Sequence, residues 1–166
     1  MPELSTHPTA AAIIEFFQDR HRELAKQAEG IGDTGVNWRP APQTNSVFEL
    51  LNHGLDAERG CLNTISGAQQ TFERRQPMPG TEALALARIQ QADADLLTFL
   101  GGDIVIDVEQ EVQYYRRAMP TMLAIALGVG HVNEHLGHVQ MTRQLWDEFG
   151  KTGVLAGWER EPTPAG

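Results

Sequence analysis

Near the start of the chain, apolar residues recur every three to four positions, which is the spacing of one face of an α-helix. The residues that carry this pattern are Ile13, Phe17, Leu24 and Ala28. Residues 1–8 lack the pattern and are expected to form a loose arm. Gly30 and Gly32 follow the last apolar position, and glycine commonly ends a helix. The pattern therefore predicts a first helix that stops at these two glycines.

A second helix has a clear start signal. Ser46 and Glu49 fit a capping box, in which the serine oxygen accepts one free amide and the glutamate accepts the amide of the serine. The helix is expected to run to about Ser66 or Gly67. A connector with two prolines, residues 33–45, precedes it.

A third predicted helix is rich in alanine and leucine, which favour helix. It is expected to begin at Thr81, an N-cap residue type, and to end at Leu100 before two glycines, Gly101 and Gly102. A polar connector, residues 69–80, lies before it.

Residues 103–115 alternate between apolar and mostly polar side chains, which is the period of a strand. The apolar members are Ile104, Ile106, Val108, Val112 and Tyr114. No turn of the Asn-Gly type interrupts the alternation, so one extended segment is predicted rather than a hairpin. The last helix is expected to begin near Pro120, because proline is favoured in the first turn, and to end at Gly150.

These elements predict an all-α four-helix bundle with long connectors and a short extended segment before the last helix. The chain has 166 residues, which suits a single domain over residues 1–166. We expect its core to span about residues 9–150 and its C-terminal tail residues 151–166, in which Trp158 is a candidate anchor.

Net charge and hydropathy limit the classes of molecule that the chain is expected to bind. The chain has 13 lysines and arginines against 22 acidic residues, so its formal net charge is −9. Nucleic acids and anionic membranes are therefore poor partners, because neutralising their charge needs clustered cations. The longest apolar run, Met122–Gly130, is far shorter than the roughly 20 residues of a membrane helix. The N-terminus lacks the basic segment of a secretory signal, so a cytoplasmic protein is expected.

The single cysteine excludes an internal disulfide, so the six histidines are the more informative residues. His131, His135 and His138 are spaced four and three apart, which places them on one face of the last helix. At about 100° per residue, the apolar residues that share this face are Leu127, Leu145 and Phe149. The histidine face is therefore expected to point into the bundle.

Three imidazoles on one inward face favour a metal ion, because each unsatisfied buried polar group costs about 1–3 kcal/mol. His131 and His135 can chelate one ion, as two histidines one turn apart do in other helices. His138 is a candidate third ligand, a partner that orients a ligand, or a substrate contact. His53 lies on a face of small residues in the second helix and is a candidate ligand from there.

Several residues near these histidines allow two interpretations. Glu134 lies about 60° from His131 around the helix and is either a general base or a solvated side chain. Gly128 and Gly130 either permit close helix packing or leave room for a ligand.

Other positions are expected to stay outside the chemistry. Cys61 is predicted to be buried and inert, and His7 and His21 to be solvated. A second apolar stripe on the last helix is either the rest of the core or a dimer face, and its members are Ile125, Val129, Val132, Leu136 and Val139.

Two segments carry a family resemblance. The first contains Asn37-Trp38-Arg39-Pro40-Ala41-Pro42, Asn45-Ser46, Leu50-Leu51-Asn52-His53 and Asp56-Ala57-Glu58. The second is His131-x-x-x-His135-x-Gly137. Together they resemble the DinB-like (YfiT-like) family, and the resemblance covers nearly the whole chain, from the first helix to about Phe149.

The resemblance implies a four-helix bundle that is usually a homodimer, with a metal triad that falls on His53, His131 and His135. It also implies a thiol S-transferase of the bacillithiol, mycothiol or glutathione class, although some members are hydrolase-like and many have no known activity. Many members have a histidine at the position of Glu134 and a glutamine at the position of His138. These two differences lie beside the triad and bear on the choice of substrate.

Three imidazoles suit zinc best, with nickel, iron or manganese as alternatives. We expect a low-molecular-weight thiol and a small-molecule electrophile as partners, with catalytic roles for Glu134 and His138. The alternatives are a metal-dependent hydrolase and a non-catalytic metal- or ligand-binding bundle. The segment from His131 to His135 also matches the H-x-x-E-H pattern of some peptidases, but the chain is too small for a peptidase domain.

Overall fold

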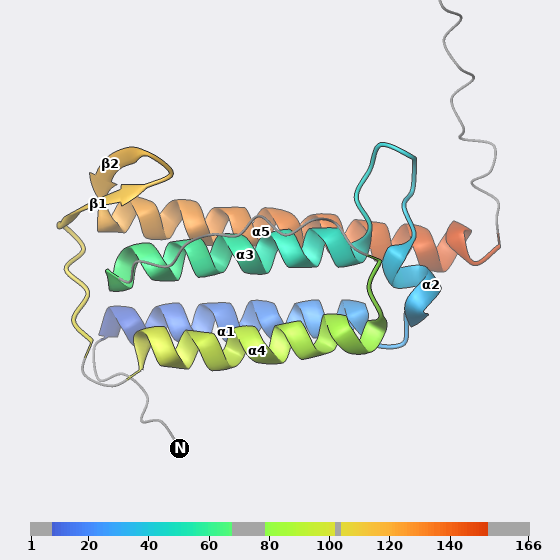
Figure 1. The fold of residues 1–166 in the computed structure, drawn as a ribbon, viewed down its shortest axis with the longest axis horizontal. Helices are drawn as coiled ribbons and strands as arrows, with labels where there is room; N and C mark the ends of the chain where they lie inside the picture. The colour runs from blue at the N-terminus through green and yellow to red at the C-terminus, as the bar shows by residue number, and fades with distance from the viewer. Residues whose placement is uncertain (1–7, 68–78, 102–103, 153–166) are drawn as a thin grey trace, which may run out of the picture.

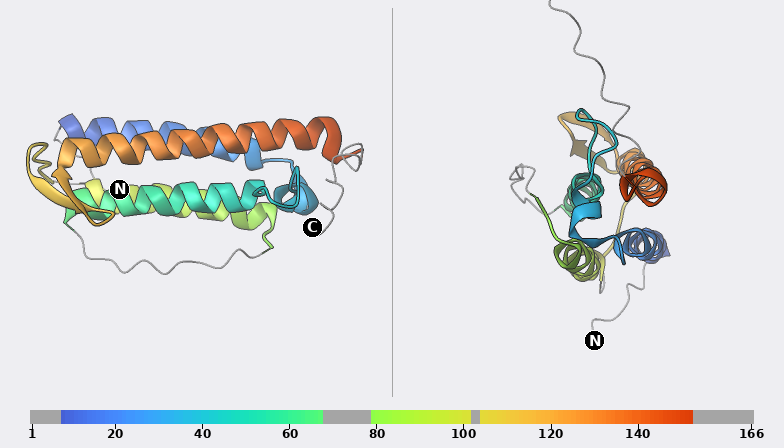
Figure 2. Two further views of the ribbon diagram at one scale, coloured as in Figure 1. Left: turned by 90° about the horizontal axis from the view of Figure 1, so that it is seen from above. Right: turned by 90° about the vertical axis from the view of Figure 1, so that its right-hand side faces the viewer.

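Four long helices run side by side in the computed structural model, which describes residues 8–67, 79–101 and 104–152 (Figure 1). They are α1 (Pro8–Ala28), α3 (Val47–Ser66), α4 (Glu82–Leu100) and α5 (Thr121–Leu145). The view along the bundle in Figure 2 shows the four helices around a common centre. The predicted all-α four-helix bundle is confirmed.

The predicted helix ends agree closely with the structure. Ser46 and Glu49 form the capping box, with the Glu49 amide donating to Ser46 Oγ at 3.3 Å and the Ser46 amide donating to Glu49 Oε2 at 2.8 Å. Thr81 Oγ1 accepts the Leu84 amide at 3.1 Å and caps α4. Gly67 ends α3 with a φ of 70°, a left-handed conformation that glycine adopts without strain.

The connector between α1 and α3 contains an element that the sequence pattern did not indicate, the short helix α2 (Gly32–Asn37). Its position is fixed by Glu82 at the start of α4, whose carboxylate accepts the amides of Gly30 and Gly32 at 2.9 and 2.7 Å. These two contacts anchor the turn before α2, while Ile31 and Val36 are buried in the apolar core.

The segment before α5 is a β-hairpin, so the prediction of one extended piece is wrong. Strands β1 (Glu111–Tyr114) and β2 (Arg117–Pro120) pair antiparallel, with Tyr114 opposite Arg117. The two turn residues, Tyr115 and Arg116, have φ values of 45° and 68°. Such a turn normally carries Asn-Gly or a similar pair, so its sequence gave no signal.

The last helix ends as predicted at Gly150, through a single π-helical turn (η1, Trp146–Gly150). Trp146 is buried, and its ring lies 5.8 Å from that of Trp38, measured between centroids. The tail from residue 153 on, with Trp158, lies outside the described residues, as do His7 and most of the 69–80 connector.

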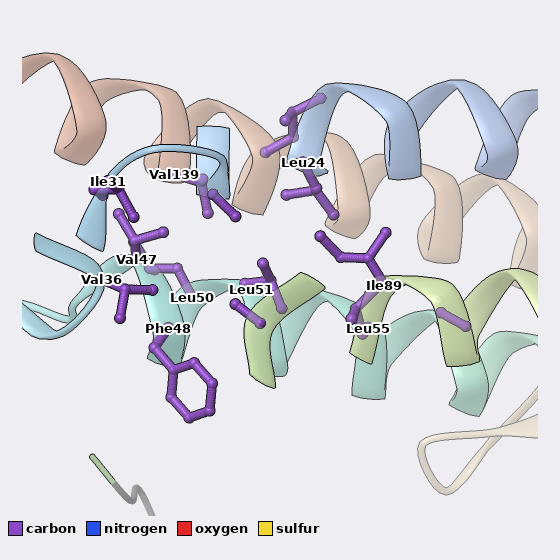
Figure 3. Packing of buried hydrophobic residues seen from close by; sticks show 14 of the residues in the cluster. Leu24, Ile31, Val36, Val47, Phe48, Leu50, Leu51, Leu55, Ile89 and Val139 are labelled. Atoms are coloured by element: carbon purple, nitrogen blue, oxygen red, sulfur yellow. The ribbon is translucent and has the colours of Figure 1, made fainter. Parts of the chain in front are cut away.

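The core consists of two apolar clusters along the bundle. Figure 3 shows side chains of the first, in which Leu51 of α3, Ile89 of α4 and Val139 of α5 face one another. The second cluster lies towards the hairpin and includes Phe17, Leu62, Leu96, Leu100 and Val132. On α5, Val132, Leu136 and Val139 are all buried. The second apolar stripe of the sequence is therefore core, and Val132, Leu136 and Val139 are not a dimer face.

The core also contains a polar contact that joins three helices. His21 of α1 is 1% exposed, which overturns the prediction that it is solvated. Its Nε2 lies 2.7 Å from Glu58 Oε2 of α3, and its Nδ1 lies 2.6 Å from Asp93 Oδ1 of α4. Burial of the imidazole is tolerated because both ring nitrogens have a partner.

None of the helices in the described residues is both long enough and apolar enough to cross a membrane.

Candidate metal centre

Three histidine side chains meet where α3 and α5 lie side by side. His131 Nε2 lies 3.3 Å from His53 Nε2 and 3.1 Å from His135 Nε2. All three residues offer ligand atoms within 4.8 Å of one another. The two histidines of α5 are one helical turn apart and therefore point the same way, while His53 comes from the facing helix.

Glycines allow the two helices to approach this closely. A Cβ atom at Gly54, the residue after His53, would lie 3.3 Å from His135 Cβ. A Cβ atom at Gly128 would lie 2.6 Å from Cys61 Cβ. Gly128 therefore serves close packing, the first of the two interpretations considered for it. At Gly130 a Cβ would meet open space.

The triad lies at the surface of the bundle. His53 is exposed, while His131 and His135 are half-buried. The prediction that the histidine face points into the bundle is therefore wrong, and Leu127 on that face is 46% exposed. The buried positions of α5 centre about 50° around the helix from His131 and His135, so these two histidines lie where the core meets solvent. We call this strip, between α3 and α5, the seam.

Both half-buried histidines favour the neutral imidazole. Burial, followed by the charges of the neighbouring His131, His53 and His138, lowers the pKa of His135 to about 4. Burial and His53 also lower the pKa of His131. A neutral imidazole has a free lone pair, which is the form that a metal ion requires.

The donor set fits a divalent metal. A neutral imidazole carries one proton, so three converging Nε2 atoms cannot all form good hydrogen bonds with one another. A cation placed among them accepts a lone pair from each. Nε2 of His135 faces His131, while its Nδ1 is buried and has no hydrogen-bond partner among the described residues. In the described residues the converging group holds three ligands, fewer than the four of a closed structural site.

Glu134 and His138 lie beside the triad. The His138 ring centroid is 5.7 Å from that of His135, but its nitrogens are not part of the converging group. His138 is exposed, as is Glu134. The charge of Glu134 acts on both half-buried histidines and opposes the lowering of their pKa values. The structure therefore places a carboxylate and an imidazole on the solvent side of the triad.

Cys61 agrees with the sequence prediction of a buried, unreactive thiol. It is 0% exposed, and burial raises its pKa to about 12. The thiolate form is therefore suppressed at neutral pH.

Sequence reasoning missed the buried contact of His21, although one signal was present. Glu58 follows Leu51 and Leu55 along the buried stripe of α3 at helical spacing. A carboxylate on an apolar face needs a buried partner. The pattern therefore predicts a buried partner for Glu58, and the structure shows that this partner is His21.

Residues of the first family-like segment have structural roles. The Asn37 side-chain amide donates to the Gly80 carbonyl at 2.7 Å, and its oxygen accepts the Gly80 amide at 2.8 Å. Arg39 pairs with Glu49 of the capping box. These contacts join segments at the end of the bundle where α3 begins.

A four-helix bundle with three converging histidines at the seam of two helices is a candidate three-histidine metal protein. The chain belongs to the DinB superfamily, since the sequence model of that family matches residues 15–165. The recognition made from the two sequence segments is confirmed.

A solved structure shows the same fold. It is the crystal structure of the DinB-like protein YjoA from Bacillus subtilis, with a TM-score of 0.64 and 17% sequence identity. The match covers 82% of this chain and 92% of that one. At this identity the likeness concerns the fold alone. No curated protein matches the sequence.

Proposed function

We propose that His53, His131 and His135 bind one divalent metal ion, zinc foremost, and that the centre serves a reaction of a low-molecular-weight thiol. The observation that supports this most strongly is the convergence of three Nε2 atoms from two helices on one point of the seam. Zinc commonly takes imidazole ligands, and three protein ligands leave a position for water or substrate.

A metal ion held there would lower the pKa of a coordinated water or thiol. Glu134 and His138, which are exposed beside the triad, would accept the proton that the thiol gives up. The thiol sulfur would form a bond to an electrophilic carbon of a second small molecule, and the leaving group would depart with the electron pair of the broken bond. If water replaces the thiol, the same centre would act as a hydrolase.

Elemental analysis of protein purified without a histidine tag tests the metal site. We expect about one zinc per chain in the wild type, and the double variant His131→Ala/His135→Ala should lose it because one imidazole cannot hold the ion. His138→Ala is the matched control and should keep the metal, since His138 lies outside the converging group.

Equal metal content in the wild type and the double variant would overturn the metal site. A screen of thiols with a chromogenic electrophile then tests the reaction. Metal binding without turnover across that screen would favour the non-catalytic metal-binding alternative.

A further inference from the structure

The β-hairpin is firmly attached beside the triad-bearing helix. The Thr121 amide and hydroxyl both donate to the Gln110 carbonyl, at 2.8 and 2.9 Å, and the Met122 amide donates to the Val108 carbonyl at 2.9 Å. From this base at the start of α5, the hairpin folds back over the end of the bundle (Figure 1), and seen from above its turn lies on the side of α3 (Figure 2). Strand β1 contacts both α3 and α5, so the hairpin lies over one end of the seam.

The inner face of the hairpin reaches close to the triad. Tyr114 is 6% exposed, and its hydroxyl would lie 3.7 Å from a Cβ atom at Gly128. Gly128 precedes His131 by three residues, which is about 4.5 Å along a helix axis. The side of the hairpin that carries Tyr114 therefore ends within about one helical turn of the histidines.

Arg117 lies on this inner face. It is directly opposite Tyr114 in the strand pairing, and opposed residues of an antiparallel pair project to the same side. Met119, two residues further along β2, is buried on that side too. Arg117 is nevertheless exposed, so the inner face extends past the covered part of the hairpin.

The charge of Arg117 has no partner in the part of the chain that the structure describes, and neither has that of Arg116. Arg20, by contrast, has a neutral partner, since its guanidinium donates to Asn133 Oδ1 at 3.2 Å. The other described cations each pair with a carboxylate, and they are Arg22, Lys26, Arg39, Arg59, Arg88, Arg143 and Lys151. In a chain of net charge −9, these two unpaired arginines form an exposed basic site on the hairpin that contacts the triad-bearing helix.

We propose that Arg117 binds the carboxylate of the small molecule that reaches the three-histidine centre, and so selects acidic over neutral substrates. This inference rests on the proposed function. The guanidinium fork matches a carboxylate with two parallel hydrogen bonds, and such charge-assisted bonds are stronger than neutral ones. The centre would hold one end of the molecule and the hairpin the other.

Binding to the Co²⁺-loaded protein tests the inference without any assay of turnover. The probes are 3-mercaptopropionate and 6-mercaptohexanoate, each paired with its neutral amide, and the visible cobalt spectrum reports binding. We expect at least one carboxylate to bind about tenfold more tightly than its amide. Arg117→Gln should abolish that preference and leave the affinity for the amides unchanged.

Arg116→Gln is the matched control, since it removes the same charge from the neighbouring turn position. It should retain most of the preference, because Arg116 is not part of the inner face. Equal loss in both variants would mean a general effect of charge and would overturn the role of Arg117. So would an absence of preference in the wild type. Failure to bind Co²⁺ would instead refute the proposed metal site, on which this inference depends.

Discussion

Glycine at position 128 allows α3 and α5 to approach closely, whereas glycine at position 130 of the same helix has no such effect. A Cβ atom at Gly128 would overlap Cys61, whereas one at Gly130 would meet nothing within 4 Å. Both glycines carry the usual helix penalty of about 1 kcal/mol relative to alanine. Only at Gly128 does packing compensate for that penalty.

Gly130→Ala should therefore raise the free energy of unfolding by about 1 kcal/mol, because it improves helix propensity without a clash. Gly128→Ala should lower it, since overpacking a closely packed site costs about 1–3 kcal/mol. Urea denaturation of both variants beside the wild type checks the two signs. A stabilising Gly128→Ala would contradict the close contact with Cys61.

The residues of the candidate site could be found from sequence, but their orientation could not. The spacing of His131 and His135 alone places both on one side of a helix. The sequence pattern alone made His53 a candidate on a face of small residues. Its position beside the other two histidines was predicted only through the family resemblance. Whether that side is buried depends on where α3 packs, and a helical pattern does not contain that information.

The elements differ in how much of their structure local sequence determines. Each long helix carries its own apolar stripe, and α3 and α4 carry capping residues as well, so both existence and ends were predictable. The hairpin depends on a turn between Tyr114 and Arg117 whose residues are unusual for it. The alternation correctly placed Val112 and Tyr114 on one face, but pairing of the strands is a property of two segments together.

The hairpin turn stores local strain that can be removed. A left-handed conformation costs a residue with a side chain roughly 1–2 kcal/mol, and both Tyr115 and Arg116 adopt positive φ. Replacing the pair by Asn-Gly should raise the free energy of unfolding by about 1–2 kcal/mol and slow amide hydrogen exchange in β1 and β2. An Ala-Ala replacement removes the same side chains but keeps the strain.

The outcome that would contradict this account is equal stability of the Asn-Gly and Ala-Ala variants. In that case the positive φ values of the turn would make no difference to the free energy of unfolding. Because Arg117 remains in both variants, the proposed carboxylate preference should survive in each.

At the scale of the whole molecule, one histidine joins three of the four long helices. Burial by itself would lower the pKa of His21, but hydrogen bonds and charges from Glu58 and Asp93 outweigh it and leave that pKa raised. Burial raises the pKa of Glu58 against the opposing effect of His21. The folded protein therefore holds protons at this contact more tightly than the unfolded chain does.

The sign of the pH dependence follows from linkage. A group whose pKa is raised on folding stabilises the protein below its unfolded pKa, and that contribution is lost as the pH rises through the folded value. For His21 the loss begins near its ordinary value of 6.5. The lowered pKa values of His131 and His135 act below that pH, and the buried thiol of Cys61 acts only towards its ordinary value of 9.0.

Between pH 6.5 and 8 we therefore expect the free energy of unfolding to fall as pH rises, by at most about 1.4 kcal/mol per pH unit for one proton. His21→Gln should flatten this slope, whatever it does to stability at one pH, since glutamine does not titrate. His138→Gln, which replaces an exposed histidine outside this contact, should leave the slope intact.

Urea denaturation in matched buffers at several pH values measures the slope of the free energy of unfolding against pH. Because the slope concerns the contact between α1, α3 and α4, it should persist in the variant that lacks His131 and His135, which separates the stability of the bundle from the chemistry of its seam.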